Sequence, residues 1–237
     1  MSEPMLKVSG LNAFYGRAHI LFDVGLEVGH GEVVALMGRN GAGKSTTMKA
    51  VMGLLPRKQG SVMFRGADIT TLPPYRIARM GMGFVPEDRR VFADLTVMEN
   101  LDTGRQPPRE GAPQWTPDKL FRLFPNLGEM PKRPGGQMSG GEQQMLTVSR
   151  TLMGNPHLVL LDEPSEGVAP VIVEQMANMI IELKREGLSI LLSEQNLHFA
   201  ELVSDRAYVL EKGQICFSGT IAELAKNETV RRAYLSV

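Results

Sequence analysis

The stretch GRNGAGKST, residues 38–46, carries the residue types of a phosphate-binding loop. It follows an apolar run over 33–37 that predicts a buried strand, and it leads into 45–52, which predicts a helix. Glycines let successive backbone N–H groups turn toward one anion, and the positive end of the helix dipole points at the same place. The stretch fits the GxxxxGK[ST] pattern, in which the lysine (Lys44) meets the β and γ phosphates and the hydroxyl (Ser45) ligates Mg²⁺.

A second stretch with the residue types for chemistry is LVLLDEP, residues 158–164, an apolar strand that ends in two adjacent carboxylates. If this strand lies beside the phosphate loop, Asp162 is placed to hold Mg²⁺ and Glu163 to deprotonate a water for in-line attack. The alternative is a strand end that faces solvent. The phosphate loop in the same chain favours the catalytic interpretation.

A third stretch, MSGGEQQMLTVSR, puts Ser139, Gly140 and Gly141 directly before a helix with apolar residues at helical spacing. In isolation this is an ordinary helix N-cap. The free N–H groups at such a start also suit a second anion. Together with the first two stretches, the anion-binding interpretation is favoured.

The composition limits the possible classes of protein. The 237 residues are 43% hydrophobic, and Lys plus Arg balance Asp plus Glu at 26 each, which disfavours a nucleic-acid-binding protein. No apolar run approaches the ~20 residues of a membrane span, and we expect no exported or membrane-spanning chain. A single cysteine, Cys216, is expected to be a small apolar residue of a strand, and the four scattered histidines show no metal spacing.

The elements that must position these stretches alternate along the chain. Residues 5–37 are rich in predicted strand, with a further short strand at 83–85. Prolines punctuate short helical segments between about 90 and 155. From 157 onward a strand, a helix over 170–185 and another strand predict a βαβ unit, and hence a parallel sheet. A hairpin around Lys212-Gly213 and short helices complete the chain.

The three stretches together resemble the ATP-binding subunits of ABC transporters: GRNGAGKST is similar to the Walker A loop, MSGGEQ to the signature and LVLLDEP to the Walker B strand. The segments GFVPEDRRVFADLTVMENL, LLDEPSEGVAP and LLSEQN further resemble the LivF-type subunit of branched-chain amino acid importers. The resemblance implies an α/β fold: a P-loop NTPase (RecA-like) core with a mostly parallel sheet, an N-terminal antiparallel β subdomain and an inserted α-helical subdomain. We expect one domain over 1–237, with 1–89 and 155–237 as the core and 90–154 as the helical subdomain.

The resemblance also implies a set of site residues. The catalytic residues are Glu163, Lys44 and Gln195, and the metal ligands are Ser45, Glu87 and Asp162. The nucleotide-binding residues are Tyr15, Gly38, Arg39, Asn40, Gly41, Ala42, Gly43, Lys44, Ser45 and Thr46, with Tyr15 stacked on adenine. The signature residues, which act on the nucleotide of a partner subunit, are Ser139, Gly140, Gly141 and Glu142.

Three positions depart from the broad family pattern. Glu87 stands where a glutamine is usual, Gln195 where a histidine contacts the γ phosphate, and Ala169 where an aspartate is frequent. His198 lies three residues too late to replace that histidine. Glutamine donates a hydrogen bond without a full positive charge, so transition-state stabilisation is expected to be weaker or shared with a partner.

The resemblance implies an ATPase that uses ATP and Mg²⁺ to power uptake of branched-chain or related amino acids. Its partners would be a second ATP-binding subunit (a sister or an identical copy), two integral-membrane permease subunits and, indirectly, an extracytoplasmic substrate-binding protein, with no nucleic acid. It would lie at the cytoplasmic face of the inner membrane. Val91, Phe92 and Leu95 are candidates for a permease groove, or else for the core. The alternatives are a urea or short-amide importer and a weakly hydrolysing regulatory module.

Overall fold

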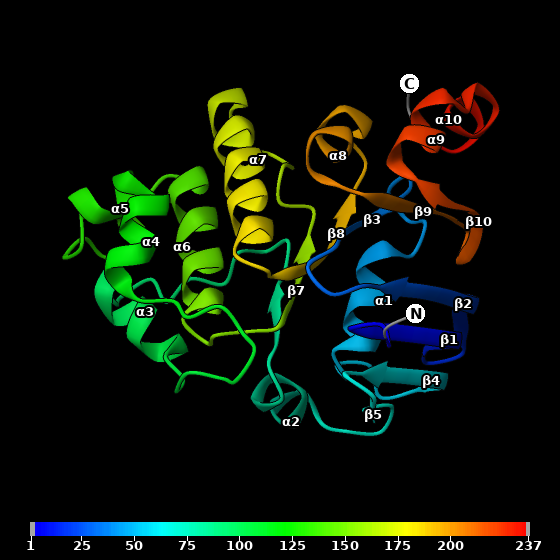
Figure 1. Cartoon of the computed structure of the whole chain (residues 1–237), viewed down its shortest axis with the longest axis horizontal. Helices are drawn as coiled ribbons and strands as arrows, with labels where there is room; N and C mark the ends of the chain where they lie inside the picture. The colour runs from blue at the N-terminus through cyan, green and yellow to red at the C-terminus, as the bar shows by residue number, and fades with distance from the viewer. Residues whose placement is uncertain (1–2, 236–237) are drawn as a thin grey trace.

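The computed structural model describes residues 3–235 and arranges them as two β-sheets with helices between and beside them (Figure 1). The strands are β1 (Leu6–Tyr15), β2 (Ala18–Val28), β3 (Val33–Met37), β4 (Lys58–Phe64), β5 (Ala67–Asp68), β6 (Met82–Val85), β7 (Leu158–Asp162), β8 (Ser189–Glu194), β9 (Arg206–Glu211) and β10 (Gln214–Thr220). The helices are α1 (Lys44–Val51), α2 (Pro74–Arg79), α3 (Val97–Gly104), α4 (Pro117–Leu123), α5 (Pro125–Glu129), the 3₁₀ turn Gly135–Gln137, α6 (Gly140–Leu152), α7 (Pro170–Arg185), α8 (Leu197–Val203), α9 (Ile221–Lys226) and α10 (Glu228–Tyr234).

The six-stranded sheet has the order β10-β9-β3-β8-β7-β6. Its five strands from β9 to β6 pair in parallel, and β10 is antiparallel at one edge. On β7, Leu158 and Leu160 pack toward the antiparallel sheet, whereas Val159 and Leu161 pack toward the helical part of the molecule. Both faces of this sheet are therefore buried, which explains why its strands are continuous apolar runs.

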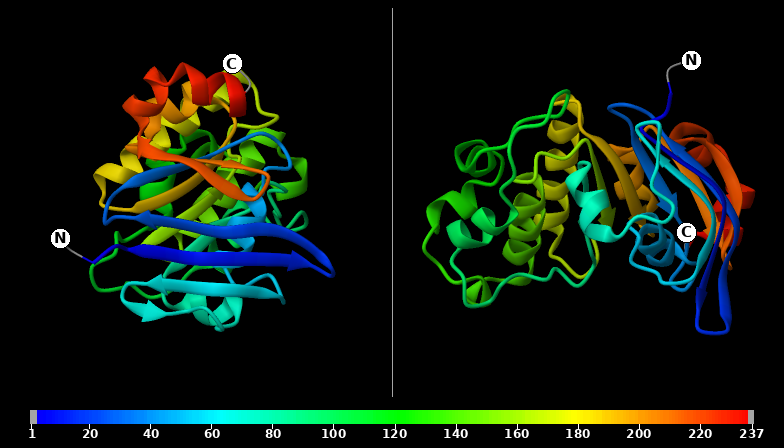
Figure 2. Two further views of the ribbon diagram at one scale, coloured as in Figure 1. Left: turned by 90° about the vertical axis from the view of Figure 1, so that its right-hand side faces the viewer. Right: turned by 90° about the horizontal axis from the view of Figure 1, so that it is seen from below.

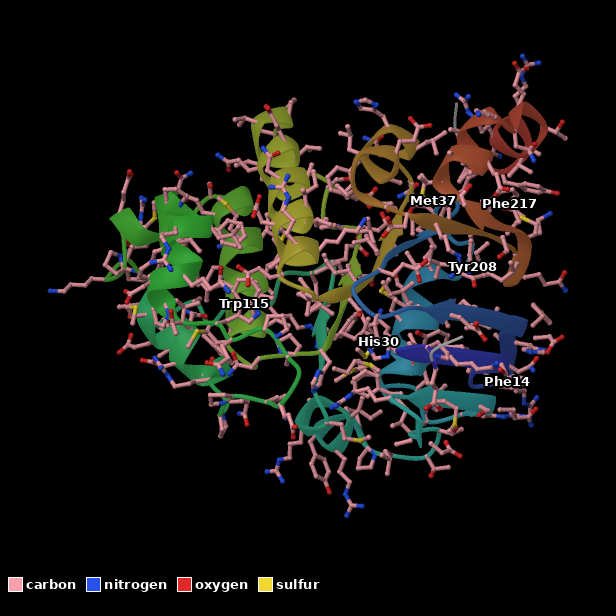
Figure 3. All side chains as sticks on the ribbon, viewed as in Figure 1. Phe14, His30, Met37, Trp115, Tyr208 and Phe217 are labelled. Atoms are coloured by element: carbon pink, nitrogen blue, oxygen red, sulfur yellow. The ribbon has the colours of Figure 1, made fainter. Side chains whose placement is uncertain are left out.

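The four-stranded sheet is antiparallel, in the order β2-β1-β4-β5, and forms a separate layer. Figure 2 shows this layer on one side and the helices α3 to α6 gathered on the other. Helix α1 lies between the two sheets and contacts β1, β2 and β7 (Figure 1). In Figure 3, Phe14 lies in the antiparallel sheet, Met37 and Tyr208 in the six-stranded sheet, and Trp115 among the helices.

The predicted fold class is confirmed: a mostly parallel sheet, an antiparallel N-terminal sheet and a helical insert are all present. The helix over 170–185 has the predicted bounds, and the hairpin turns at Lys212 and Gly213, both with positive φ. The first helix begins at Lys44, one residue earlier than expected. We retain the division into 1–89 with 155–237 and 90–154 as a proposal. Among residues 3–235, no helix is both long enough and apolar enough to cross a membrane.

Candidate functional site

The phosphate loop joins β3 to α1 and is pressed against neighbouring strands. Gly38 has φ 152°, and a Cβ added there would lie 2.4 Å from the carbonyl oxygen of Leu210. Gly43 has φ 113°, and a Cβ there would lie 2.8 Å from Leu21. Only glycine fits these two positions. Gly43 also caps α1 without any side-chain hydrogen bond, so the first N–H groups of the helix keep no side-chain partner and suit an anion.

Lys44 is buried at this loop, with 3% of its side chain exposed. Its Nζ donates to the carbonyl oxygens of Gly38 at 2.7 Å and Arg39 at 3.0 Å. The same Nζ lies 3.0 Å from Oε1 of Glu163, whose side chain is 6% exposed. The structure therefore brings the predicted lysine of the loop and the predicted base together as a buried ion pair.

Asp162 is the last residue of β7 and is 1% exposed. Its Oδ1 accepts hydrogen bonds from the hydroxyls of Ser45 at 3.0 Å and Ser193 at 2.6 Å. Burial raises the pKa of Asp162, and the two hydroxyl bonds oppose that rise. A carboxylate beside a hydroxyl is a set of hard oxygen donors of the kind Mg²⁺ binds, alongside waters and substrate phosphates. Within residues 3–235, no cluster of three or more His, Cys, Asp or Glu residues could hold a metal by itself.

Glu163 follows Asp162 in a left-handed conformation, with φ 47°. Its Oε2 accepts from Nε2 of Gln195 at 2.7 Å, and the same Nε2 lies 2.8 Å from Oδ1 of Asn40. Burial raises the pKa of Glu163, but hydrogen bonds from Glu166, Gln195 and Lys44 outweigh burial and hold the pKa below its usual range. Glu163 is therefore a carboxylate at neutral pH, as a general base must be.

Glu166 belongs to the same cluster, although it was not predicted from the sequence. Its pKa is raised to about 7 by its hydrogen bond to Glu163, by partial desolvation and by the negative charges of Glu163 and Glu87. Nε2 of Gln195 also lies 3.4 Å from Oε2 of Glu166. The signal in the sequence was the position of Glu166, which is a third acidic residue close to the Asp162-Glu163 pair.

Two further residues were missed at the end of β8. Ser193, opposite Asp162 in the sheet register, bonds to the Asp162 carboxylate and accepts from the backbone N–H of Glu163 at 3.0 Å. Glu194 is 2% exposed, and burial is the main cause of its raised pKa. It accepts from the backbone N–H groups of Ser165 and Asn196, both at 3.2 Å. The carboxyl ends of adjacent parallel strands meet at one edge of a sheet. The polar end of the segment LLSEQN was therefore the sequence signal that could have found both residues.

The signature residues form a surface separate from this cluster. Ser139 caps α6: its Oγ accepts from the N–H of Glu142 at 3.4 Å, and the Glu142 carboxylate accepts from the N–H of Ser139 at 2.7 Å. A Cβ added at Gly140 would lie 2.4 Å from the guanidinium of Arg89, and one at Gly141 would lie 2.8 Å from Ile172. No hydrogen bond or ion pair within residues 3–235 joins the signature side chains to Lys44 or Glu163.

The remaining predicted residues occupy more open positions. Tyr15 is 46% exposed at the end of β1, and Glu87 is exposed after β6. His198 is exposed on α8. Of the three groove candidates, Phe92 is exposed whereas Val91 and Leu95 are half-buried. Within the phosphate loop, the exposed residues are Arg39, Asn40 and Gly41, Thr46 is half-buried, and Ala42 is buried.

These features together define a P-loop nucleotide site. A glycine-rich loop precedes a helix, an acidic strand end lies beside the loop, and a polar strand end lies opposite. Residues 21–166 match the family profile described as ABC transporter, and the chain belongs to this family. The predicted family membership is thereby confirmed.

Particular relatives narrow the comparison. The chain is 46% identical to the high-affinity branched-chain amino acid transport ATP-binding protein BraG of Pseudomonas aeruginosa, over 98% of this chain and 99% of that protein. It is 36% identical to a probable branched-chain amino acid transport ATP-binding protein, LivF, of Archaeoglobus fulgidus, over 98% and 99%. Among solved structures, the ADP conformation of MJ1267, an ATP-binding cassette of an ABC transporter, matches with a TM-score of 0.81 and 27% identity, covering 98% of both chains.

Proposed function

We propose that this chain is the ATP-hydrolysing subunit of an importer that takes up branched-chain or related amino acids through separate membrane permease subunits. The observation that carries the ATPase proposal is the Glu163 carboxylate, held between Lys44 and Gln195 beside the phosphate loop. The similarity to BraG and LivF supports the cargo class, and favours it over urea or short amides. Because Glu163 is ionised and can accept a proton, ATP hydrolysis is favoured over a purely regulatory role.

In this proposal, different residues of the chain bind the phosphates, hold the metal and accept the proton. The free N–H groups at the start of α1 and the Lys44 ammonium bind the β and γ phosphates. Ser45 and Asp162 would hold Mg²⁺, with Glu87 as a further candidate; the metal supplies positive charge against the phosphate oxygens when bound. Glu163 takes the proton from the attacking water, and the Gln195 amide orients Glu163.

A second ATP-binding subunit, either a sister or an identical copy, would complete each site. Ser139, Gly140, Gly141 and Glu142 would contact the nucleotide held by that partner, consistent with their separation from Lys44 in one chain. Tyr15 would stack on adenine, since its ring is partly exposed at the end of β1.

The permease subunits would dock in a groove between the two parts of the chain. This cavity of about 630 Å³ lies among α1, α2, β6 and the helical insert. Leu54, Tyr75 and Phe92 line it and are 46%, 55% and 50% exposed. We propose a short helix of the permease as the occupant, which would place this chain at the cytoplasmic face of the inner membrane. An extracytoplasmic substrate-binding protein would act only through the permease.

Phosphate release and ATP binding test the proposal in two variants. Glu163→Gln should bind ATP with Mg²⁺ and lose at least about 100-fold in turnover, because the general base is gone. Lys44→Ala should weaken ATP binding instead, since charge-assisted hydrogen bonds are each worth about 1.5–3 kcal/mol.

The control is Glu201→Gln, which removes the same charge from an exposed position on α8 and should change neither quantity. Thermal unfolding of each variant checks that the fold survives. Unchanged turnover in Glu163→Gln would show that Glu163 is not the general base. A chain that binds no ATP would contradict the whole proposal.

A further inference from the structure

Three arginines from three separate segments of the chain line one cavity away from the phosphate loop. Arg65 follows β4, Arg79 ends α2, and Arg109 lies in the segment that leads out of α3. The cavity has a volume of about 460 Å³, and its remaining lining residues are Phe64, Ala67, Met80, Glu110 and His157. We refer to it as the arginine pocket.

The positive charge of the arginine pocket is largely uncompensated. Within residues 3–235, none of the three guanidinium groups forms an ion pair, whereas several other arginines of the chain do. Among the described residues that line the cavity, Glu110 is the one with an acidic side chain. The Arg79 guanidinium lies over the ring of Tyr75, 5.7 Å from its centroid. Guanidinium groups that lack acidic partners attract anions, and their planar forks suit oxyanions.

His157 forms the buried wall of the pocket, with 4% of its surface exposed. Its Nε2 accepts a hydrogen bond from Nη1 of Arg65 at 2.7 Å. Burial and the charges of Arg65 and Arg109 together lower its pKa to about 4, and a hydrogen bond to the backbone of Gly111 opposes them. The imidazole is therefore neutral near pH 7 and orients Arg65 without adding charge.

Arg109 is fixed by backbone carbonyls. Its guanidinium donates to the carbonyl oxygens of Arg79 and Gly154, the latter at 3.2 Å. These bonds tie the end of α2 to the segment before β7 and hold a third charge beside the other two. Such prior ordering lowers the entropic cost of binding a ligand.

The arginine pocket is distinct from the nucleotide site. His157 immediately precedes β7, and Asp162 ends it, so the two sites lie at opposite ends of the same strand. Five residues of strand span about 16 Å.

We infer that the arginine pocket binds a phosphate group. A carboxylate offers two oxygens, whereas a phosphate offers three or four and can accept from guanidinium groups on several sides. The phosphate could belong to a small phosphorylated compound or to the headgroup of an anionic lipid.

Titration with inorganic phosphate, followed by NMR of the imidazole of His157, tests the inference. With four histidines in the chain, the variant His157→Gln assigns the signal. Phosphate should shift the signal saturably, and sodium chloride at equal ionic strength should not. Arg79→Gln should weaken the apparent affinity at least tenfold, and Arg79→Lys by less, because lysine keeps the charge but not the fork.

The matched control is Arg76→Gln, which removes an arginine of the same helix that does not line the cavity and should change the affinity less than twofold. Phosphate bound at the phosphate loop would not depend on Arg79. The inference fails if phosphate and chloride act alike at His157, or if Arg76→Gln weakens binding as much as Arg79→Gln does.

A second arm separates the two sources of phosphate. Flotation with phosphatidylglycerol vesicles, compared with phosphatidylcholine vesicles, should reveal Arg79-dependent binding if a lipid headgroup is the ligand. Phosphate binding at His157 without vesicle binding assigns the pocket to a small phosphorylated compound. Absence of binding in both arms overturns the inference.

Discussion

Glu163 draws its contacts from residues that lie far away in the sequence. Lys44 reaches its Oε1 at 3.0 Å, and Gln195 reaches its Oε2 at 2.7 Å. The Gln195 amide also contacts Asn40 of the phosphate loop at 2.8 Å. In the proposed mechanism, glutamine would use both of its amide hydrogens where the broad family has histidine, one to orient the base and one on the loop that would hold the phosphates.

Glu166 should make the stability of the protein depend on pH. Its folded pKa is raised to about 7 from an ordinary value of 4.5, so the folded state binds the extra proton between these values. The stabilisation from Glu166 is therefore full below about pH 4.5 and is lost as the pH rises through 7. Glu166→Gln cannot titrate and keeps a hydrogen-bond donor toward Glu163.

Thermal unfolding at pH 5 and pH 8 checks this prediction. The unfolding temperature of the natural chain, measured relative to Glu166→Gln at each pH, should be lower at pH 8 than at pH 5. A difference that stays constant with pH would show that Glu163 and Glu166 are not coupled in the folded protein.

Among the elements, α3 and α6 approach each other closely at one glycine. A Cβ added at Gly104 would lie 2.0 Å from the backbone carbonyl oxygen of Arg150. Because the obstacle is backbone, it cannot move aside as a flexible side chain would. The contact fixes how α3 packs on the helix that carries the signature residues.

Gly104→Ala should lower the free energy of unfolding by about 1–3 kcal/mol, the usual cost of overpacking. Gly25→Ala in β2 is the control, since its Cβ would meet only an ordinary contact 3.7 Å away, and it should cost clearly less. Urea denaturation of the two variants measures both values. Equal losses of unfolding free energy in the two variants would show that α3 and α6 accommodate the added methyl group without an extra cost in stability.

At the scale of the whole molecule, no hydrogen bond or ion pair within residues 3–235 joins the phosphate loop to the signature residues. Lys44 is buried beside Glu163, and Ser139 is exposed at the start of α6. If two chains supply one complete site, hydrolysis needs an encounter between them.

The specific rate of phosphate release should therefore rise with protein concentration and then level off. A hundredfold concentration series, with Glu163→Gln as the background, measures it; if the partner is a sister subunit, the rise appears on adding that subunit. A specific rate that is the same at every concentration, with and without the sister, would contradict the need for a second subunit.

Much of this protein could be predicted from short stretches of the chain. Continuous apolar runs indicated the strands of the parallel sheet, and GRNGAGKST indicated the phosphate loop, because strand periodicity and glycine spacing are properties of neighbouring residues. For the same reason Asp162 and Glu163 could be assigned to a strand end. The helix over 170–185 was predicted at its observed bounds.

Folding alone decided which side chains surround these residues. Asn40 and Gln195 are 155 positions apart, and Ser193 meets Asp162 only because β7 and β8 are adjacent. The raised pKa of Glu166 likewise depends on its hydrogen bond to Glu163 and on the charge of Glu87, which the fold brings in from another loop. No local pattern records such pairings, since through-space electrostatics and burial depend on which segments the tertiary structure places side by side.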